Sequence, residues 1–161
     1  MEIKFKKLTP EAVIPKRAHD GDAGLDLFLP REVKVLQGRQ IIPLDFAIEL
    51  PHGYCAEIQP RSGFASKGIE CRMRPASVTR EDADFRVKSR ADADVLYGLI
   101  DENYRGCVGV IVNNYDRPFM LDAGTRIAQM VIRQVPETTF IEVSDLGDSE
   151  RGEGGFGSTG K

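Results

Sequence analysis

The chain has 161 residues, of which 41% are apolar and 29% charged, and its formal net charge at pH 7 is −3. These values fit one globular domain, exclude disorder of the whole chain, and disfavour a general nucleic-acid binder, which would carry a basic excess. The longest uncharged stretch, residues 106–115, is too short to cross a bilayer, and the charged first residues do not resemble a signal peptide. Three cysteines without a CxxC pair predict neither a disulfide framework nor a zinc site. We therefore expect a cytoplasmic protein (host-cell cytoplasm for a viral source) with no membrane or nucleic-acid partner.

Alternating apolar and polar residues predict strands along most of the chain. The alternation runs through residues 2–6, 46–50, 55–59, 69–74 and 108–113. A Pro-His-Gly turn at 51–53 separates two of these strands, and one short helix is predicted to begin at Ser62 and to continue to Lys67. Nine prolines and sixteen glycines disfavour long helices. The pattern predicts an all-β sandwich or barrel with one short helix.

Two regions depart from this alternation. Residues 72–94 carry eleven charges in 23 positions and few large apolar side chains, so we interpret them as a solvated excursion from the barrel. Residues 151–160 contain five glycines, which predicts a flexible tail when no ligand is bound. The tail also matches the letters of two phosphate-binding motifs, but neither has the strand and helix that such motifs need. It is either a plain disordered tail or a segment that orders over an anion and a flat ring.

Four further segments carry groups suited to binding or catalysis, although each also has a plain structural explanation. Residues 60–63, Pro-Arg-Ser-Gly, place backbone donors, a hydroxyl and a guanidinium at a strand end, which suits an anion, but they also suit a surface turn. Asp101 follows Leu99 and Ile100, which would partly desolvate it as a general base, or it simply ends a strand. Asp26 lies between two leucines, either at a metal's outer shell or facing solvent. Residues 124–129 open another strand with two candidate polar contacts, Arg126 and Gln129.

Taken together, five segments in this order resemble the five motifs of the trimeric dUTP diphosphatase (dUTPase) family. They are Ala23–Leu27, Pro60–Gly63, Gly98–Gly106, Gly124–Gln129 and Arg151–Gly160, and the resemblance covers nearly the whole chain. It implies a single domain over residues 1–161 with a distorted jelly-roll barrel (β-clip), and a mobile C-terminal arm at about 147–161. It also implies a homotrimer with active sites at subunit interfaces. The implied reaction is hydrolysis of dUTP to dUMP and pyrophosphate with Mg²⁺, which limits uracil in DNA and supplies dUMP for dTMP synthesis.

The resemblance also implies roles for individual residues. Asp101 would be the general base that activates water for in-line attack on the α-phosphorus, and Asp26 would contact Mg²⁺ through water. Tyr104 would lie against the deoxyribose, and the backbone around Leu99 would select uracil. The other implied substrate-binding residues are Arg61, Ser62, Gly63 and Gln129 on the phosphates, Arg151 on the γ-phosphate, Phe156 stacked on uracil, and Gly157, Ser158 and Thr159 in the closing tail.

The sequence departs from the family pattern in three places. The link between Gly68 and Gly98 has 29 residues where the family needs only a short strand and hairpin, so residues of about 72–94 form an insertion beside the base pocket. Val95 stands where some members have an amide, and Asn103 stands where many have a second acid. The insertion is either a solvated loop, a lid, or a contact for a protein partner. Two alternative functions stay open: a nucleotide-gated protein-binding regulator and an enzyme related to dCTP deaminase.

Overall fold

The computed structural model describes residues 1–73 and 87–154. In that part the chain forms thirteen strands and one helix, which confirms the predicted all-β class with a single short helix. Their bounds are β1 Lys4–Lys7, β2 Leu25–Phe28, β3 Val33–Val35, β4 Gly38–Pro43, β5 Phe46–Glu49, β6 Tyr54–Gln59, α1 Ser62–Lys67, β7 Ile69–Met73, β8 Val87–Ala91, β9 Ala93–Val95, β10 Gly98–Ile100, β11 Gly109–Asn114, β12 Phe119–Leu121 and β13 Arg126–Gln134. No helix in these residues is long and apolar enough to span a membrane.

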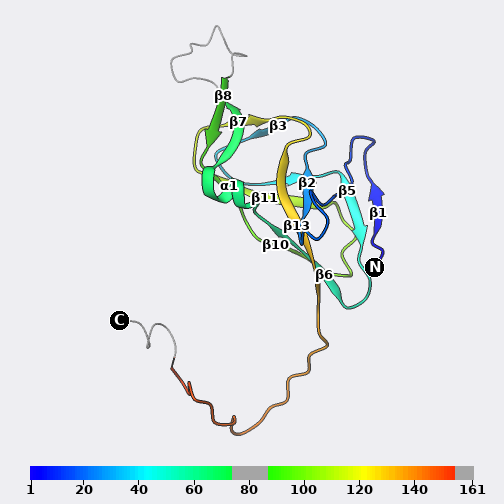
Figure 1. Ribbon diagram of the computed structural model, residues 1–161, viewed down its shortest axis with the longest axis vertical. Coiled ribbons are helices and arrows are strands. Elements are labelled where there is room, and N and C mark those ends of the chain that lie inside the picture. Colours follow the sequence, from blue (N-terminus) through cyan, green and yellow to red (C-terminus); the bar gives the residue numbers. More distant parts are fainter. Residues whose placement is uncertain (74–86, 155–161) are drawn as a thin grey trace.

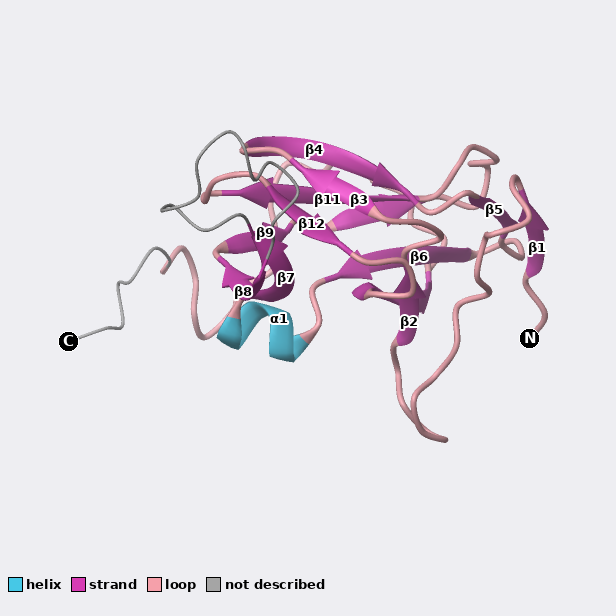
Figure 2. Cartoon of the chain, turned by 90° about the horizontal axis from the view of Figure 1, so that it is seen from above, coloured by secondary structure: helices cyan, strands magenta, loops and turns pink. Residues whose placement is uncertain are grey.

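The strands form four antiparallel sheets that wrap into a distorted barrel, with α1 on its outside (Figures 1 and 2). Two sheets have four strands, in the orders β10-β6-β13-β2 and β3-β12-β7-β8. A three-stranded sheet, β4-β11-β9, and the β1-β5 pair complete the set. Neighbours in these sheets come from distant parts of the sequence, so the site groups meet only after the barrel closes.

The core follows the predicted alternation of apolar residues. In β11 the side chains of Val110 and Val112 are buried, whereas Ile111 between them is partly exposed. Phe46 of β5 is also buried, and its ring centroid lies 4.9 Å from that of Phe5 in β1. Burying each such side chain contributes on the order of 1.5–3 kcal/mol to folding, so the core holds the barrel without disulfides.

Helix α1 turns the chain sharply after β6. Arg61, just before it, has an extended backbone with φ −79° and ψ 142°. The helix ends at Gly68, whose φ of 71° suits glycine and whose N–H donates to the carbonyl of Phe64 at 2.9 Å. A Cβ at Gly68 would lie 2.5 Å from the carbonyl oxygen of Ala91, so no side chain fits there. The turn therefore fixes Arg61, Ser62 and Gly63 between a strand and a helix.

The interpretation of residues 72–94 as one solvated excursion is wrong at both ends. Residues 72–73 belong to β7, which pairs with β8 from Ile69 opposite Ala91 to Met73 opposite Val87. Residues 93–95 form β9, and the side chains of Ala91, Ala93 and Val95 are buried. The sequence signal was weak because small alanines supply the apolar face of these strands. Residues 74–86 lie outside the described residues.

A C-terminal arm leaves the barrel after β13 and runs away from it (Figure 1). Every residue from 133 to 153 is exposed. Phe140, Ile141 and Leu146 expose 96%, 80% and 88% of their surface, values that are unusual for large apolar side chains in a folded chain. The sequence analysis predicted that the arm begins at about residue 147, but the exposed segment already begins at residue 133.

Candidate active site

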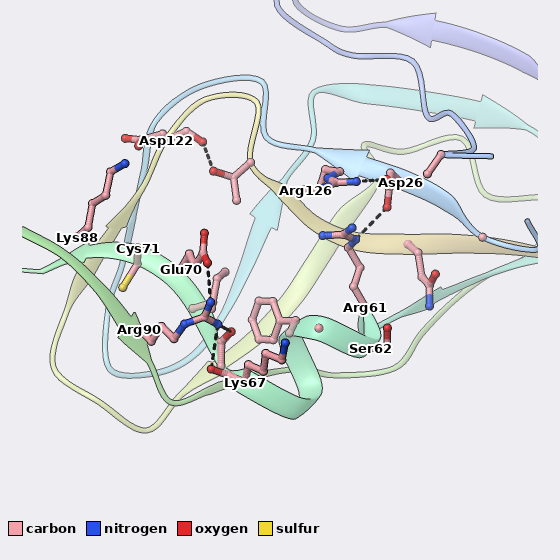
Figure 3. A pocket seen from close by; sticks show the side chains of 18 of the residues that line it. Asp26, Arg61, Ser62, Lys67, Glu70, Cys71, Lys88, Arg90, Asp122 and Arg126 are labelled. Atoms are coloured by element: carbon pink, nitrogen blue, oxygen red, sulfur yellow. Dashed lines mark hydrogen bonds and ion pairs between the residues drawn. The ribbon is translucent and has the colours of Figure 1, made fainter.

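An open groove of about 1340 Å³ runs between β2, β13, α1 and the β7–β8 hairpin (Figure 3). Six of the residues singled out in the sequence line it together: Asp26, Arg61, Ser62, Gly63, Arg126 and Gln129. They come from three segments that are far apart in the chain. The barrel thus joins the anion-binding turn, the candidate metal-associated acid and the candidate polar contact of β13 into one site.

The register of the β10-β6-β13-β2 sheet explains why these residues lie together. In β13, Gln129 lies opposite Asp26 of β2 on one side and opposite Gln59 of β6 on the other. Arg61 follows Gln59 by two residues, at the point where the chain turns into α1. Three neighbouring strands therefore present their polar residues in one row beneath the helix.

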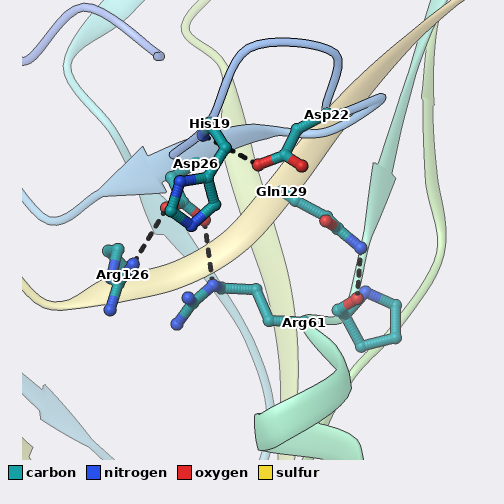
Figure 4. A network of polar contacts seen from close by, with 7 residues as sticks. His19, Asp22, Asp26, Arg61, Arg126 and Gln129 are labelled. Atoms are coloured by element: carbon teal, nitrogen blue, oxygen red, sulfur yellow. Dashed lines mark hydrogen bonds and ion pairs between the residues drawn. The ribbon is translucent and has the colours of Figure 1, made fainter. Parts of the chain in front are cut away.

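Two arginines hold the carboxylate of Asp26 (Figure 4). The Nε atom of Arg61 lies 2.9 Å from Oδ1, and Nη1 of Arg126 donates to Oδ2 at 3.2 Å. Asp26 is only 8% exposed, and a buried carboxylate needs such partners. Of the two sequence interpretations of Asp26, the solvent-facing one is therefore wrong. The arrangement orients the Arg61 guanidinium along the groove.

Gln129 is fixed from both sides. Its Nε2 donates to the carbonyl oxygen of Pro60 at 3.0 Å, which ties β13 to the turn before α1. A Cβ at Gly24 would lie 2.4 Å from Oε1 of Gln129, so a larger residue there would displace this amide. The amide thus braces the anion-binding turn from within the groove.

The groove is more cationic than the sequence motifs indicated. Its described lining contains six cations and four carboxylates. Lys67 at the end of α1 and Lys88 and Arg90 of β8 extend the cationic wall beyond Arg61 and Arg126. Sequence reasoning missed Lys88 and Arg90 because it placed residues 72–94 outside the barrel. It also assigned no role to Lys67 and no partner to Arg126. An excess of positive charge in a concave site favours a polyanionic ligand.

The groove lining does not include three of the predicted site residues, Asp101, Leu99 and Tyr104. Strand β10 runs antiparallel to β6, with Ile100 opposite Ala56 and Gly98 opposite Ile58. Asp101 therefore lies beside the start of β6, whereas Arg61 lies beyond its end. At about 3.3 Å per residue this separation along the strand is roughly 20 Å. One chain does not bring the candidate base to the groove.

The surroundings of Asp101 also differ from expectation. Its side chain is exposed, and Leu99 is itself 54% exposed, so these neighbours do not desolvate the carboxylate within one chain. Tyr104 is exposed as well, and its hydroxyl donates to the carbonyl oxygen of Cys107 at 3.0 Å. Residues 98–106, here called the Asp101 segment, are thus largely exposed and do not face the groove within one chain.

The tail residues form a third group. Arg151 lies in the exposed arm, where its Nε donates to the carbonyl oxygen of Gly154 at 2.6 Å, away from the groove. Phe156, Gly157, Ser158 and Thr159 lie outside the described residues. The predicted site residues thus fall into three separate groups: the groove, the Asp101 segment and the arm.

Comparisons with known proteins give consistent matches over nearly the whole chain. The sequence model of the dUTPase family matches residues 10–82 and 86–160. The deoxyuridine 5'-triphosphate nucleotidohydrolase of Clostridium kluyveri is 39% identical over 163 residues, covering 99% of both chains, and that of Arabidopsis thaliana is 40% identical over 160 residues, covering 98% of this chain and 82% of the relative. Among solved structures, a mutant dUTPase of Staphylococcus bacteriophage 80alpha with dUpNHpp has a TM-score of 0.79 at 25% identity, with 99% of each chain covered.

Proposed function

This chain belongs to the dUTPase family, and from that premise we propose that it hydrolyses dUTP to dUMP and pyrophosphate. The observation that carries the proposal is the cationic groove in which Asp26 holds Arg61 beside Ser62 and Gly63. A triphosphate is the kind of ligand that such a groove attracts. The relatives named as nucleotidohydrolases favour this reaction over the deaminase-related enzyme and over a pure binding regulator.

The groove residues would bind and orient the triphosphate. Arg61, Ser62 and Gly63 present a guanidinium, a hydroxyl and backbone N–H groups at the start of α1. Charge-assisted hydrogen bonds from arginine to phosphate are short and directional, so an Arg61 already oriented by Asp26 loses little freedom on binding. Ser62 would lie near the bridge oxygen where negative charge develops as pyrophosphate leaves.

Asp101 would act as general base. Its carboxylate takes a proton from one water molecule, the resulting hydroxide attacks the α-phosphorus, and the bond from that phosphorus to the bridging oxygen breaks in line. The bridging oxygen leaves with the pyrophosphate, and the hydroxyl oxygen stays on dUMP. This assignment requires Asp101 to face the α-phosphate, which it does only if another chain supplies the groove.

The donor set of the groove fits Mg²⁺ held by water and substrate rather than by a protein cage. Among the described residues no group of three metal-binding side chains exists, and both oxygens of Asp26 already accept from arginines. Mg²⁺ commonly keeps several waters and binds through one or two carboxylates plus phosphates. Asp26 would therefore contact waters of the ion, whose charge would neutralise the triphosphate.

The separation of the groups supports a site shared between subunits of a homotrimer. The roughly 20 Å of strand β6 between Asp101 and Arg61 is too long for one substrate phosphate to meet both. The arm, with Phe140 and Ile141 fully exposed, needs a surface to cover it. One copy would supply the groove, a second would supply the Asp101 segment, and the arm of a third would bring Arg151 and Phe156.

Selection of the deoxyuridine moiety would come from the Asp101 segment. Backbone groups around Leu99 would hydrogen-bond uracil, and a wrong base would leave them unpaired. Tyr104, held by Cys107, would pack on the sugar and exclude a 2′-hydroxyl. The product dUMP would serve dTMP synthesis, and loss of dUTP would limit uracil in DNA, in the cytoplasm.

Pyrophosphate release from the purified protein, compared for dUTP, dCTP, dTTP and UTP with Mg²⁺, tests the proposal. We expect a strong preference for dUTP, loss of turnover in Asp101→Asn, and a trimer mass by light scattering. Ammonia release from dCTP would instead support the deaminase-related enzyme. Binding of dUTP without any turnover would support the binding regulator, for which deletion confined to residues 74–86 tests the protein contact.

A further inference from the structure

A carboxylate next to the candidate base ties the Asp101 segment to the turn between β5 and β6. Oε2 of Glu102 accepts the backbone N–H of Gly53 at 2.6 Å, and Oε1 lies 3.1 Å from Nδ1 of His52. These contacts join residues that are about fifty positions apart in the sequence. Glu102 thus closes a link between the end of β10 and the start of β6 that the sheet pairing alone does not make.

The link matters because it holds the turn that carries Asp101. Within residues 1–73 and 87–154, its carboxylate has no hydrogen-bond partner, so the backbone alone sets its place. That backbone forms a turn, in which the N–H of Tyr104 donates to the carbonyl of Asp101 at 3.1 Å. On one side the turn is held by β10, through Ile100 opposite Ala56. On the other side, Glu102 holds it.

The residue that Glu102 holds is itself fixed. Gly53 has a φ of 77°, which an L side chain rarely adopts. Its carbonyl accepts the N–H of Val135 at 2.8 Å, where β13 passes into the C-terminal arm. Gly53 therefore bonds the Asp101 segment through its N–H and the root of the arm through its carbonyl, and gives Glu102 a rigid anchor.

The charges around Glu102 favour its ionised form. The Gly53 N–H, followed by the His52 hydrogen bond, lowers the pKa of Glu102, and Arg105 adds to this. The hydrogen bond to Glu102 raises the pKa of His52, and Glu137 at the root of the arm acts in the same direction. At neutral pH Glu102 is thus a carboxylate that accepts the Gly53 N–H whether or not His52 is protonated.

We propose that Glu102 is a positioning residue for the reaction, acting through Gly53 to hold Asp101 in line with the α-phosphate. The proposal rests on the proposed function, because it assumes that Asp101 deprotonates the attacking water. It makes no use of direct contact between Glu102 and substrate. Displacing a reacting group by about 1 Å can cost on the order of 100-fold in rate, so a loosened turn should show in kcat.

The test compares Glu102→Ala and Glu102→Gln with Glu49→Ala in the full-length protein. Glu49 is the matched control, since it is also a glutamate in one exposed ion pair, 2.8 Å from Lys4, and its pKa is also lowered, chiefly by that hydrogen bond. We expect Glu102→Ala to lower kcat roughly ten- to hundred-fold with KM for dUTP changed by less than about threefold. Glu102→Gln keeps an acceptor for Gly53 and should recover most of kcat. Glu49→Ala should match wild type.

Amide hydrogen exchange of Gly53 provides a readout that is independent of activity. We expect faster exchange in Glu102→Ala than in wild type and Glu102→Gln. If the wild type is active and Glu102→Ala shows faster Gly53 exchange but a normal kcat, the positioning role is refuted while the proposed function stands. A wild-type protein without dUTP turnover would refute the proposed function and with it this proposal. If Glu102→Ala does not fold, a roughly ten- to hundred-fold loss of kcat in Glu102→Gln, whose acceptor is intact, would also refute the role.

Discussion

The pairing of Asp26 with Arg61 and Arg126 makes a quantitative prediction for Asp26→Asn. The substitution keeps the size of the side chain but removes its charge, and it turns an amide NH₂ toward one guanidinium. Asp26 is nearly buried, so the protein cannot replace the lost acceptor with water at that position. Both stability and substrate binding should fall.

The expected magnitude follows from the two contacts. A hydrogen bond to a charged group contributes about 1.5–3 kcal/mol, and two are affected. The arginine side chains retain 30% and 48% exposure, so water recovers part of the loss for each of them. We therefore expect a net loss of about 2 kcal/mol in the free energy of unfolding. For a chain of this size that corresponds to a fall in Tm of roughly 4–8 °C.

Activity should fall further than stability alone explains. Without Asp26, Arg61 is free to sample other rotamers and must be ordered when the triphosphate binds. We expect kcat/KM for dUTP to fall at least about tenfold, equivalent to roughly 1.4 kcal/mol of lost transition-state stabilisation. Differential scanning fluorimetry at one protein concentration and steady-state pyrophosphate release measure the two effects.

Asp122→Asn is the matched control. Asp122 lines the same groove and pairs with Arg72 at 2.6 Å, but its side chain is 63% exposed. A pair so open to water contributes little, so we expect a change within about 0.5 kcal/mol. Equal losses of stability for Asp26→Asn and Asp122→Asn would refute the argument from burial. Unchanged kcat/KM in Asp26→Asn would refute the claim that Asp26 orients Arg61.

Three further predictions concern pH, thiol reactivity and packing. The ion pair between His52 and Glu102 is complete between the ordinary pKa of a glutamate, 4.5, and that of a histidine, 6.5. As the pH rises, the pair is lost when His52 deprotonates at its raised pKa. As the pH falls, it is lost when Glu102 is protonated at its lowered pKa. The Tm difference between wild type and His52→Gln should therefore be largest between about pH 4.5 and 6.5; a difference that grows above pH 8 would contradict this. Burial raises the pKa of Cys71 to about 11, so iodoacetamide at pH 8 should label Cys107 first, as peptide mass spectrometry would show. Gly24→Ala should displace the amide beside it and raise KM for dUTP while the far-UV spectrum stays unchanged; an unchanged KM would mean that the groove tolerates the methyl group.

Much of the fold could be predicted from the sequence because its signals are local. Period-two alternation identified β11, and the Pro-His-Gly turn before β6 lies where expected. The short helix from Ser62 to Lys67 also has its predicted bounds, since glycine follows it directly. In each case neighbouring residues carry the information, so no long-range pairing had to be known.

The composition of the groove could be predicted only in part. The segments around Asp26 and Arg61 were identified separately, but their ion pair depends on strand register, which no local pattern encodes. Arg126 joins them because β13 has an irregularity between Arg126 and Ala128 that shifts its register against β2. Strands β8 and β9 escaped prediction because charge density dominated a stretch whose buried positions are mostly alanine.

The pairing of β7 with β8 has a practical consequence for engineering. Five cross-strand pairs set the register of this hairpin, and its outer strand contributes Lys88 and Arg90 to the groove wall. The free energy of closing a loop rises only slowly with its length, so the chain between Met73 and Val87 is a suitable place to graft a fluorophore or a small reporter domain. Such a graft would follow strands whose residues Arg72 and Lys88 line the groove. The hairpin therefore offers an attachment point for a nucleotide biosensor.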